Sequence, residues 1–185
     1  MTTEPAKAEL PKSPNSLRLT LWVLLIVYIF NFLDRQIVNI LAEPISRDLG
    51  LSDTQIGLMT GIAFAAFYTF LGIPIARYAD RPKTNRVGLI SVSLIIWSGM
   101  TALCGVAQNF VQLLLARIGV GVGEAGCTPA AHSLIADLAP PEKRASAISF
   151  YSLGIPIGSL LGMVIGGLVA DAYGWRAAFL IAGLP

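Results

Sequence analysis

Long apolar stretches separated by short polar connections form the dominant pattern along this chain. Five stretches are long enough for a helix that spans the hydrocarbon core of a membrane, which requires roughly 20 apolar residues. They cover residues 18–41, 55–78, 87–107, 111–137 and 146–170. A sixth apolar stretch begins near Trp175 and continues to Pro185. The pattern predicts an all-α integral membrane protein.

The two ends of the chain depart from this pattern in different ways. Residues 1–16 contain three prolines, mixed charges and no apolar run, so we expect a disordered tail rather than a cleavable signal peptide. The sixth stretch covers about 15 Å at roughly 1.5 Å per residue, around half of the membrane. We therefore expect residues 17–185 to form one transmembrane unit whose sixth helix, at 175–185, is incomplete.

Composition supports the membrane class and excludes others. Hydrophobic residues make up 55% of the 185 residues and charged residues 13%, whereas about 25% charged is usual in soluble domains. The net charge of +2 and the absence of a basic stretch interleaved with aromatic residues argue against a nucleic-acid partner. Cys104 and Cys127 lie in apolar runs without metal-ligand spacing, so we expect packing roles, no metal site and no cofactor.

The basic residues of the connections divide unequally between the two sides of the predicted membrane. Nine fall on one side, namely Lys7, Lys12, Arg18, Arg77, Arg81, Lys83, Arg86, Lys143 and Arg144, and two on the other, Arg47 and Arg176. Cytoplasmic connections are enriched in Lys and Arg, so the amino terminus is predicted to be cytoplasmic. This bias also argues against a half that dimerises upside down with a second copy of itself.

Four ionisable residues fall inside the predicted spans: Asp34 and Arg35 in the first, Arg117 and Glu124 in the fourth. Each is costly at membrane depth and needs a partner or a water-filled cavity. Asp34, Arg35 and Arg117 lie roughly 9–12 Å deep and Glu124 roughly 20 Å, so Asp34 can meet Arg117 at one level. Asn31 and Asn39 share an arc of roughly 140° with Asp34 and Arg35, which indicates a polar stripe.

We interpret Asp34 and Glu124 as protonatable carboxylates whose charge Arg35 and Arg117 balance. Binding of a proton or another cation would then rearrange the pairing and couple an ion gradient to movement. A static ion-pair network that holds helices together would leave the same pattern in the sequence, so this alternative stays open.

Gly121, Gly123 and Gly126 together spell the GxGxxG fingerprint of dinucleotide-binding enzymes. That motif must follow a strand in a βαβ unit, whereas here it lies within a membrane-length apolar run. We therefore expect no enzyme, and interpret the glycines as sites of close helix approach or cavity space.

Glycines recur every four residues at Gly154, Gly158, Gly162 and Gly166, which predicts a close-packing seam on the fifth helix. Pro156 lies within this seam, where its missing N–H can bend the helix.

His132 is the only histidine, and we expect it to be buried in a packing or hydrogen-bonding role rather than to relay protons or bind a metal.

Three stretches of the chain resemble the major facilitator superfamily, and the resemblance extends from Leu17 onward. Ala76-Arg-Tyr-Ala-Asp80-Arg81 with Arg86 is similar to the cytoplasmic signature after the second helix, with Ala76 in place of the usual glycine. Arg117-Ile-Gly-Val-Gly121 followed by Gly123-Glu124-Ala125 fits the fourth-helix pattern, and Pro141-Glu-Lys-Arg144 resembles the loop after it. Gly174-Trp175-Arg176 is similar to the opening of the sixth helix.

Asn31-Phe-Leu-Asp34-Arg35-Gln in the first helix, together with Gly-Glu-Ala in the fourth, resembles the spinster-like branch of this superfamily. The resemblance implies the amino-terminal, six-helix half of a secondary transporter, with the first and fourth helices lining a central cavity. Candidates for lining that cavity are Asn31, Asn39, Gly121 and His132. The branch implies movement of lysolipid-like or other small solutes, linked to protons or facilitated, and leaves symport, antiport and uniport open.

The cytoplasmic signature also predicts a gate formed by Asp80, Arg81 and Arg86. Asp80 can accept hydrogen bonds from helix N-termini, and the two arginines can pair with acidic groups of a partner half. The expected partners are thus membrane lipid, a small-molecule or lysolipid-like substrate, protons and a second transmembrane half. The expected location is the plasma membrane, the inner membrane if the source is bacterial. The competing interpretation is an inactive fragment or a membrane scaffold without transport activity.

Overall fold

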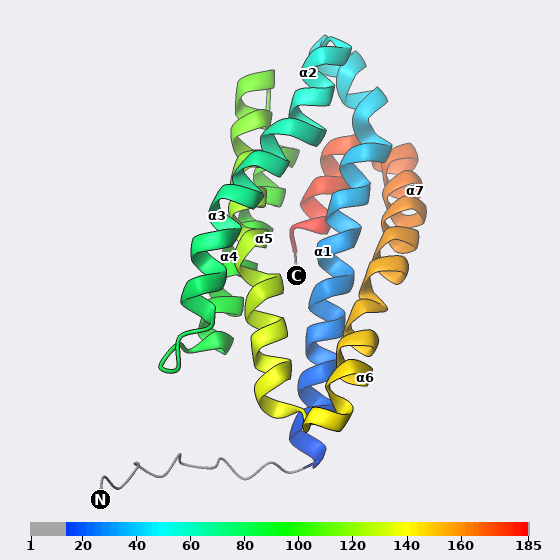
Figure 1. Cartoon of the computed structure of the whole chain (residues 1–185). Helices are drawn as coiled ribbons and strands as arrows, with labels where there is room; N and C mark the ends of the chain where they lie inside the picture. Colours follow the sequence, from blue (N-terminus) through cyan, green and yellow to red (C-terminus); the bar gives the residue numbers. More distant parts are fainter. Residues whose placement is uncertain (1–13, 185) are drawn as a thin grey trace, which may run out of the picture.

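The computed structural model describes residues 14–184, and the described part of the chain is a bundle of helices without strands (Figure 1). Five of its helical segments are long and apolar enough to cross a membrane. The elements are α1 (Pro14–Leu49), α2 (Asp53–Gly57), η1 (Leu58–Ile62), α3 (Ala63–Ala79), α4 (Arg86–Gly105), α5 (Phe110–Leu138), α6 (Pro141–Ser152) and α7 (Gly154–Ala182). The all-α prediction is confirmed.

The first helix is longer than the predicted span of 18–41, because α1 begins at Pro14 and ends at Leu49. Residues 1–13 of the predicted disordered tail lie outside the described residues. Its last three residues, 14–16, are helical instead. A proline suits the first turn of a helix because the N–H it lacks would have no intrahelical partner there.

The second membrane-spanning segment is continuous but contains a π-helical turn. A capping box starts it, in which Gln55 N donates to Ser52 Oγ over 3.3 Å and Ser52 N donates to Gln55 Oε1 over 2.9 Å. Further along, η1 inserts a wider turn in which the Thr60 hydroxyl donates to the Ile56 carbonyl over 2.9 Å. A π turn contains an extra residue, so it rotates the following helix α3 relative to α2.

The fifth segment is divided into two helices close to Pro156. Leu153 separates α6 from α7, one residue after Ser152. Pro156 lacks the N–H that would donate to the Ser152 carbonyl in a regular helix, so the helical hydrogen bonds are interrupted at this point.

A second break in α7 marks the start of the sixth helix. Gly174 has φ 84° and ψ 164°, a conformation that a residue with a Cβ rarely adopts. Directly after it, Trp175 Nε1 and Arg176 Nη1 both donate to Asp48 Oδ2, over 3.2 Å and 2.5 Å. These two hydrogen bonds attach the start of the sixth helix to the end of α1.

The predicted glycine seam is confirmed, and its partner is α1. A Cβ added at Gly158 would lie 2.3 Å from the Ile29 carbonyl oxygen, and one at Gly162 would lie 2.6 Å from that of Leu33. Gly154 and Gly166 meet the same face of α1 at Tyr28 and Ile37. Small residues thus let the α1 and α7 backbones approach closely, as in other membrane helix pairs.

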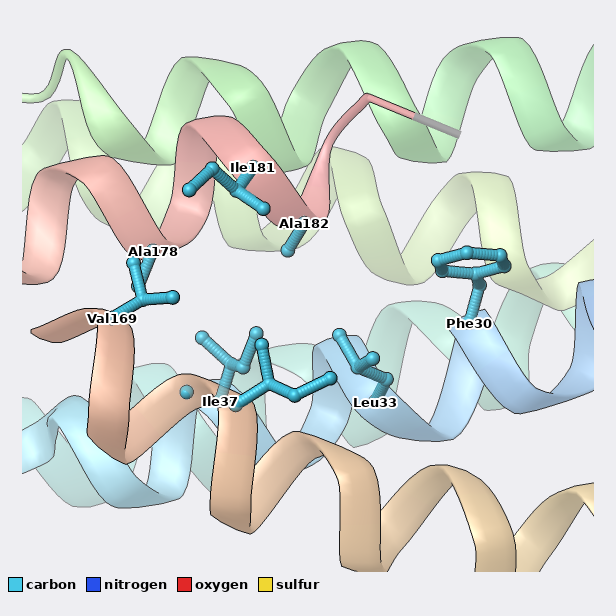
Figure 2. Close-up of a pocket in the computed structure, with 9 residues that line it drawn as sticks. Phe30, Leu33, Ile37, Val169, Ala178, Ile181 and Ala182 are labelled. Carbon is cyan, nitrogen blue, oxygen red and sulfur yellow. The ribbon is translucent and has the colours of Figure 1, made fainter.

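An apolar pocket of about 100 Å³ lies where α1 faces both parts of α7 (Figure 2). Leu33 and Ile37 line it from α1, Val169 lines it from one part of α7, and Ala178 and Ala182 line it from the other. The outward faces of the bundle are also apolar, with Phe70, Ile95 and Tyr173 each more than 70% exposed. Such an exposed apolar surface is what a lipid-facing helix bundle presents.

Candidate functional site

The four ionisable residues at membrane depth come together between α1 and α5. Asp34 and Arg35 are consecutive residues of α1, and Arg117 and Glu124 lie about two turns apart on α5. Asp34 and Glu124 are 0% exposed and Arg117 is 2% exposed. Burial of this kind is tolerated only when each charge has a partner.

Two ion pairs connect the helices. Arg117 Nη1 donates to Asp34 Oδ2 over 3.2 Å, the pair that helical depth alone suggests. Arg35 Nε donates to Glu124 Oε2 over 2.7 Å. The pairs differ in access, because the Arg35 side chain is 27% exposed whereas both members of the Asp34–Arg117 pair are nearly inaccessible.

Aromatic rings surround the more accessible cation. The Arg35 guanidinium carbon lies 5.2 Å from the Phe32 ring centroid, 5.1 Å from that of Phe64 and 4.9 Å from that of Tyr68. Phe64 also lies 5.5 Å from the Arg117 guanidinium carbon. These distances are within the range of cation–π attraction, so Arg35 keeps favourable neighbours even apart from Glu124.

The site opens into a cavity of about 220 Å³. Arg35 and Arg117 line it, together with Asn39 and Thr60. Within the bundle, Glu124 Oε1 and both amide atoms of Asn31 are buried without a hydrogen-bond partner among the described residues. Unpaired buried polar atoms are uncommon and costly, and here they lie on the two helices that carry the charges.

The predicted cavity-lining residues have different surroundings. Asn39 lines the cavity, and Gly121 is buried against Phe64, which an added Cβ would meet at 3.3 Å. Asn31 is 1% exposed and therefore lies in the core of the bundle rather than on its surface. The expectation that His132 is buried is wrong: its side chain is exposed, and its ring meets Tyr151 edge-on at 5.5 Å. His132 therefore contacts α6 through one edge of its ring and is otherwise accessible in the described part of the chain.

The three residues of the predicted cytoplasmic gate differ in their surroundings. Arg86, expected to pair with a partner half, binds within this chain: it forms an ion pair with Asp137, and its Nε donates to Ser133 Oγ over 2.7 Å and to the Ala79 carbonyl over 3.1 Å. Arg86 thus joins the ends of α3, α4 and α5. Asp80 and Arg81 are exposed and remain available to a partner.

The GxGxxG glycines serve helix packing. A Cβ at Gly123 would lie 2.6 Å from the Trp97 backbone nitrogen, and one at Gly126 would lie 2.3 Å from Ser93 Oγ. Both contacts are with α4, which packs along α5. No group of three or more potential metal ligands occurs within residues 14–184.

Phe64 and Tyr68 contact Arg35 but were not among the predicted site residues. The two rings are stacked, with centroids 5.8 Å apart, and both face Arg35. Their spacing of four residues places them on one helical face, which was a visible signal. The sequence does not show that this face meets Arg35 and Arg117, because this contact depends on how α3 packs against α5.

The chain is similar in sequence to known membrane transporters. Residues 24–185 match the family model described as Major Facilitator Superfamily. The chain is 43% identical to an MFS-type efflux pump of Mycolicibacterium smegmatis, over 87% of this chain and 37% of that protein. It is 32% identical to protein spinster homolog 3 of Danio rerio, over 86% of this chain and 32% of that protein.

A solved structure shares the architecture as well. It is a bacterial homolog of the human lysosomal transporter Spinster, in an inward-facing and unoccupied conformation. The superposition has a TM-score of 0.86 at 41% sequence identity, and it covers 94% of this chain and 41% of that one. The chain thus spans well under two thirds of the length of the relatives it matches.

Proposed function

This chain belongs to the major facilitator superfamily, and from that premise we propose that its buried charges couple proton movement to the transport of a small organic or lipid-like solute. The expected resemblance to this superfamily and its spinster-like branch is confirmed, as is the half-transporter fold. The family and its named relatives are transporters, so the chain is not an enzyme. Its helices form a multi-pass membrane protein.

A second transmembrane half is part of the proposal. Transporters of this fold move two bundles against each other around a site near the middle of the membrane. The chain spans 37% of the efflux pump and 41% of the spinster homologue. We infer that alternating access requires a complementary bundle, which meets the side of α1 and α5 that carries Arg35.

The observation that carries the proposal is the pair between Arg35 and Glu124 at 2.7 Å. Glu124 Oε1 accepts no hydrogen bond from the described residues, so a proton can bind there without displacing a donor. Protonation would remove the attraction that holds Arg35, while the partly exposed guanidinium keeps its three aromatic neighbours. The Arg35–Glu124 pair is therefore the switch of the proposed mechanism.

The pair between Asp34 and Arg117 has a different role in this proposal. Both side chains are at most 3% exposed, and separating a fully buried ion pair leaves an uncompensated charge. Opening of the second pair would follow, rather than precede, the release of Arg35. Asp34 and Glu124 remain the proposed coupling carboxylates, with Arg117 and Arg35 as their charge partners.

Substrate and orientation are proposed from the relatives and from charge. Spinster homologues are among the similar proteins, which supports a lysolipid-like or other amphiphilic solute. The amino-terminal end of α1, the α3–α4 connection and α6 lie at the same end of the bundle (Figure 1). The basic residues in these elements or directly next to them are Arg18, Arg77, Arg81, Lys83, Arg86, Lys143 and Arg144. This arrangement supports a cytoplasmic amino terminus in a plasma membrane.

Proton uptake in proteoliposomes tests the function directly. The chain is reconstituted as given and, separately, extended through a complete second half, and a lysophospholipid is added. We expect proton uptake from the extended protein only. Glu124→Gln and Asp34→Asn should each reduce this uptake by at least about tenfold, because a neutral amide cannot carry the proton.

Asp171→Asn is the matched control, because Asp171 is an exposed carboxylate on α7 outside the site. The control should keep full proton uptake. If Glu124→Gln and Asp34→Asn also keep it, the charges form a static network and the coupling proposal is wrong. If the folded, extended protein takes up no protons with any amphiphile, the scaffold interpretation gains support instead.

A further inference from the structure

A second cavity lies far from the buried charges, between the first turns of α1 and helix α6. Its volume is about 480 Å³, larger than that of the cavity beside Arg35. Leu17, Leu21 and Trp22 line it from α1, and Lys143 and Phe150 line it from α6. The transport proposal makes no use of this groove.

The groove combines positive charge with an apolar wall. Arg18 and Lys143 are its charged lining residues, one on each helix, and both are exposed. Among residues 14–184, no acidic side chain lines it. A ligand that complements this lining carries negative charge at one end and hydrocarbon at the other.

The aromatic residues indicate where the two ends of such a ligand would lie. Trp22 and Phe150 meet edge-on with centroids 5.0 Å apart, and Trp22 is 53% exposed. Trp22 follows Arg18 by one helical turn, about 6 Å along α1, so the ring lies deeper in the bundle than the cation. Tryptophan at this depth is typical of the boundary between lipid headgroups and acyl chains.

We propose that this groove binds an anionic phospholipid of the surrounding leaflet. Arg18 and Lys143 hold the phosphate, and the acyl chain lies along Leu17, Leu21 and the Trp22 ring. Basic pockets between membrane helices are suited to anionic headgroups, and the cytoplasmic leaflet is the one rich in them. The proposal goes beyond the transport function and does not depend on proton coupling, so each can fail alone.

Quenching of tryptophan fluorescence by brominated lipids tests the groove. The chain is reconstituted in vesicles that contain brominated phosphatidylglycerol or brominated phosphatidylcholine, and the Trp22 signal is taken as the difference from the Trp22→Phe variant. We expect phosphatidylglycerol to bind beside Trp22 at least about tenfold more strongly than phosphatidylcholine. Each cation should contribute roughly fivefold, so Arg18→Gln with Lys143→Gln should abolish the preference.

Arg77→Gln with Lys83→Gln is the control, because it removes the same charge from exposed positions on α3 and the α3–α4 connection. This variant should keep the preference for phosphatidylglycerol, and circular dichroism should show the same helix content in all variants. Equal quenching by both lipids in the unmodified chain overturns the proposal. So does equal loss of preference in both double variants, or displacement of the lipid by soluble glycerol phosphate, which would identify a site for water-soluble anions.

Discussion

Individual charged residues dominate the chemistry of this chain, because the membrane interior makes each of them costly. Asp34 and Arg117 are buried from solvent almost completely, and each is the ion-pair partner of the other. Arg35 is partly exposed and has three aromatic neighbours besides Glu124. Both carboxylates are fully buried, so the two pairs differ in the exposure and the aromatic neighbours of their arginines and not in the burial of their acidic partners.

This difference leads to a stability prediction at the residue scale. Arg117→Leu leaves Asp34 buried without its cation and should lower the free energy of unfolding by roughly 3–5 kcal/mol. The double variant Asp34→Leu with Arg117→Leu should lose less than Arg117→Leu alone, because no uncompensated charge remains. The measurement is unfolding in mixed micelles by added dodecyl sulfate, followed by circular dichroism. A double variant whose loss equals the sum of the two single losses would contradict the coupling of these residues.

At the scale of elements, close helix contacts and local breaks position these residues. The glycine seam brings α7 against α1, and Gly123 and Gly126 bring α5 against α4. The π turn η1 precedes α3, whose first turn carries Phe64 between the two arginines. Arg86 then joins α4 to the ends of α3 and α5. The charges meet because these contacts determine how α1, α3 and α5 are rotated.

Two glycines of α7 allow a matched test of the seam. A methyl group at Gly158 would lie 2.3 Å from the Ile29 carbonyl oxygen, whereas one at Gly167 would meet no atom within 4 Å. Gly158→Ala should therefore lower the free energy of unfolding by roughly 1–3 kcal/mol, the usual cost of overpacking. Gly167→Ala should be neutral or slightly stabilising, because alanine favours the helix. Equal effects in the same micelle titration would show that α1 and α7 do not pack through this seam.

At the scale of the whole molecule, the bundle has two chemically different ends. The end with the start of α1, the α3–α4 connection and α6 carries most of the basic residues (Figure 1). At the other end, Asp48 binds Trp175 and Arg176 and closes α1 onto the sixth helix. The sides between the two ends are largely apolar, so the bundle fits a membrane with either end in the cytoplasm. The enrichment of basic residues at one end predicts that this end is the cytoplasmic one.

Cysteine labelling in cells tests the predicted orientation. Lys83→Cys introduces a thiol in the α3–α4 connection and Asp53→Cys introduces one at the start of α2, both at exposed positions. The native Cys104 and Cys127 are buried, so their background labelling should be low. A membrane-impermeant maleimide should label Asp53→Cys in intact cells and Lys83→Cys only after permeabilisation. The reverse pattern would place the amino terminus outside the cytoplasm.

Local hydrophobicity and helical period, which can be read along the chain, were sufficient to predict several properties of this protein. These include the membrane class, the five long helices, the start of a sixth helix near Trp175, the glycine seam and the depth at which Asp34 can meet Arg117. Each of these properties depends on the residues of one helix or on the depths of two residues in the membrane. The amino-acid sequence is therefore sufficient to predict it.

Which side chains face one another depends on how the helices pack in three dimensions. Arg35 and Glu124 are 89 residues apart in sequence, and their contact depends on the rotation and register of two separate helices. The same holds for Phe64 beside Arg35 and Arg117, for Arg86 binding Asp137 inside the chain, and for His132 lying exposed. Helical period leaves these relative rotations free, because it specifies the faces of one helix and not the neighbour that each face meets.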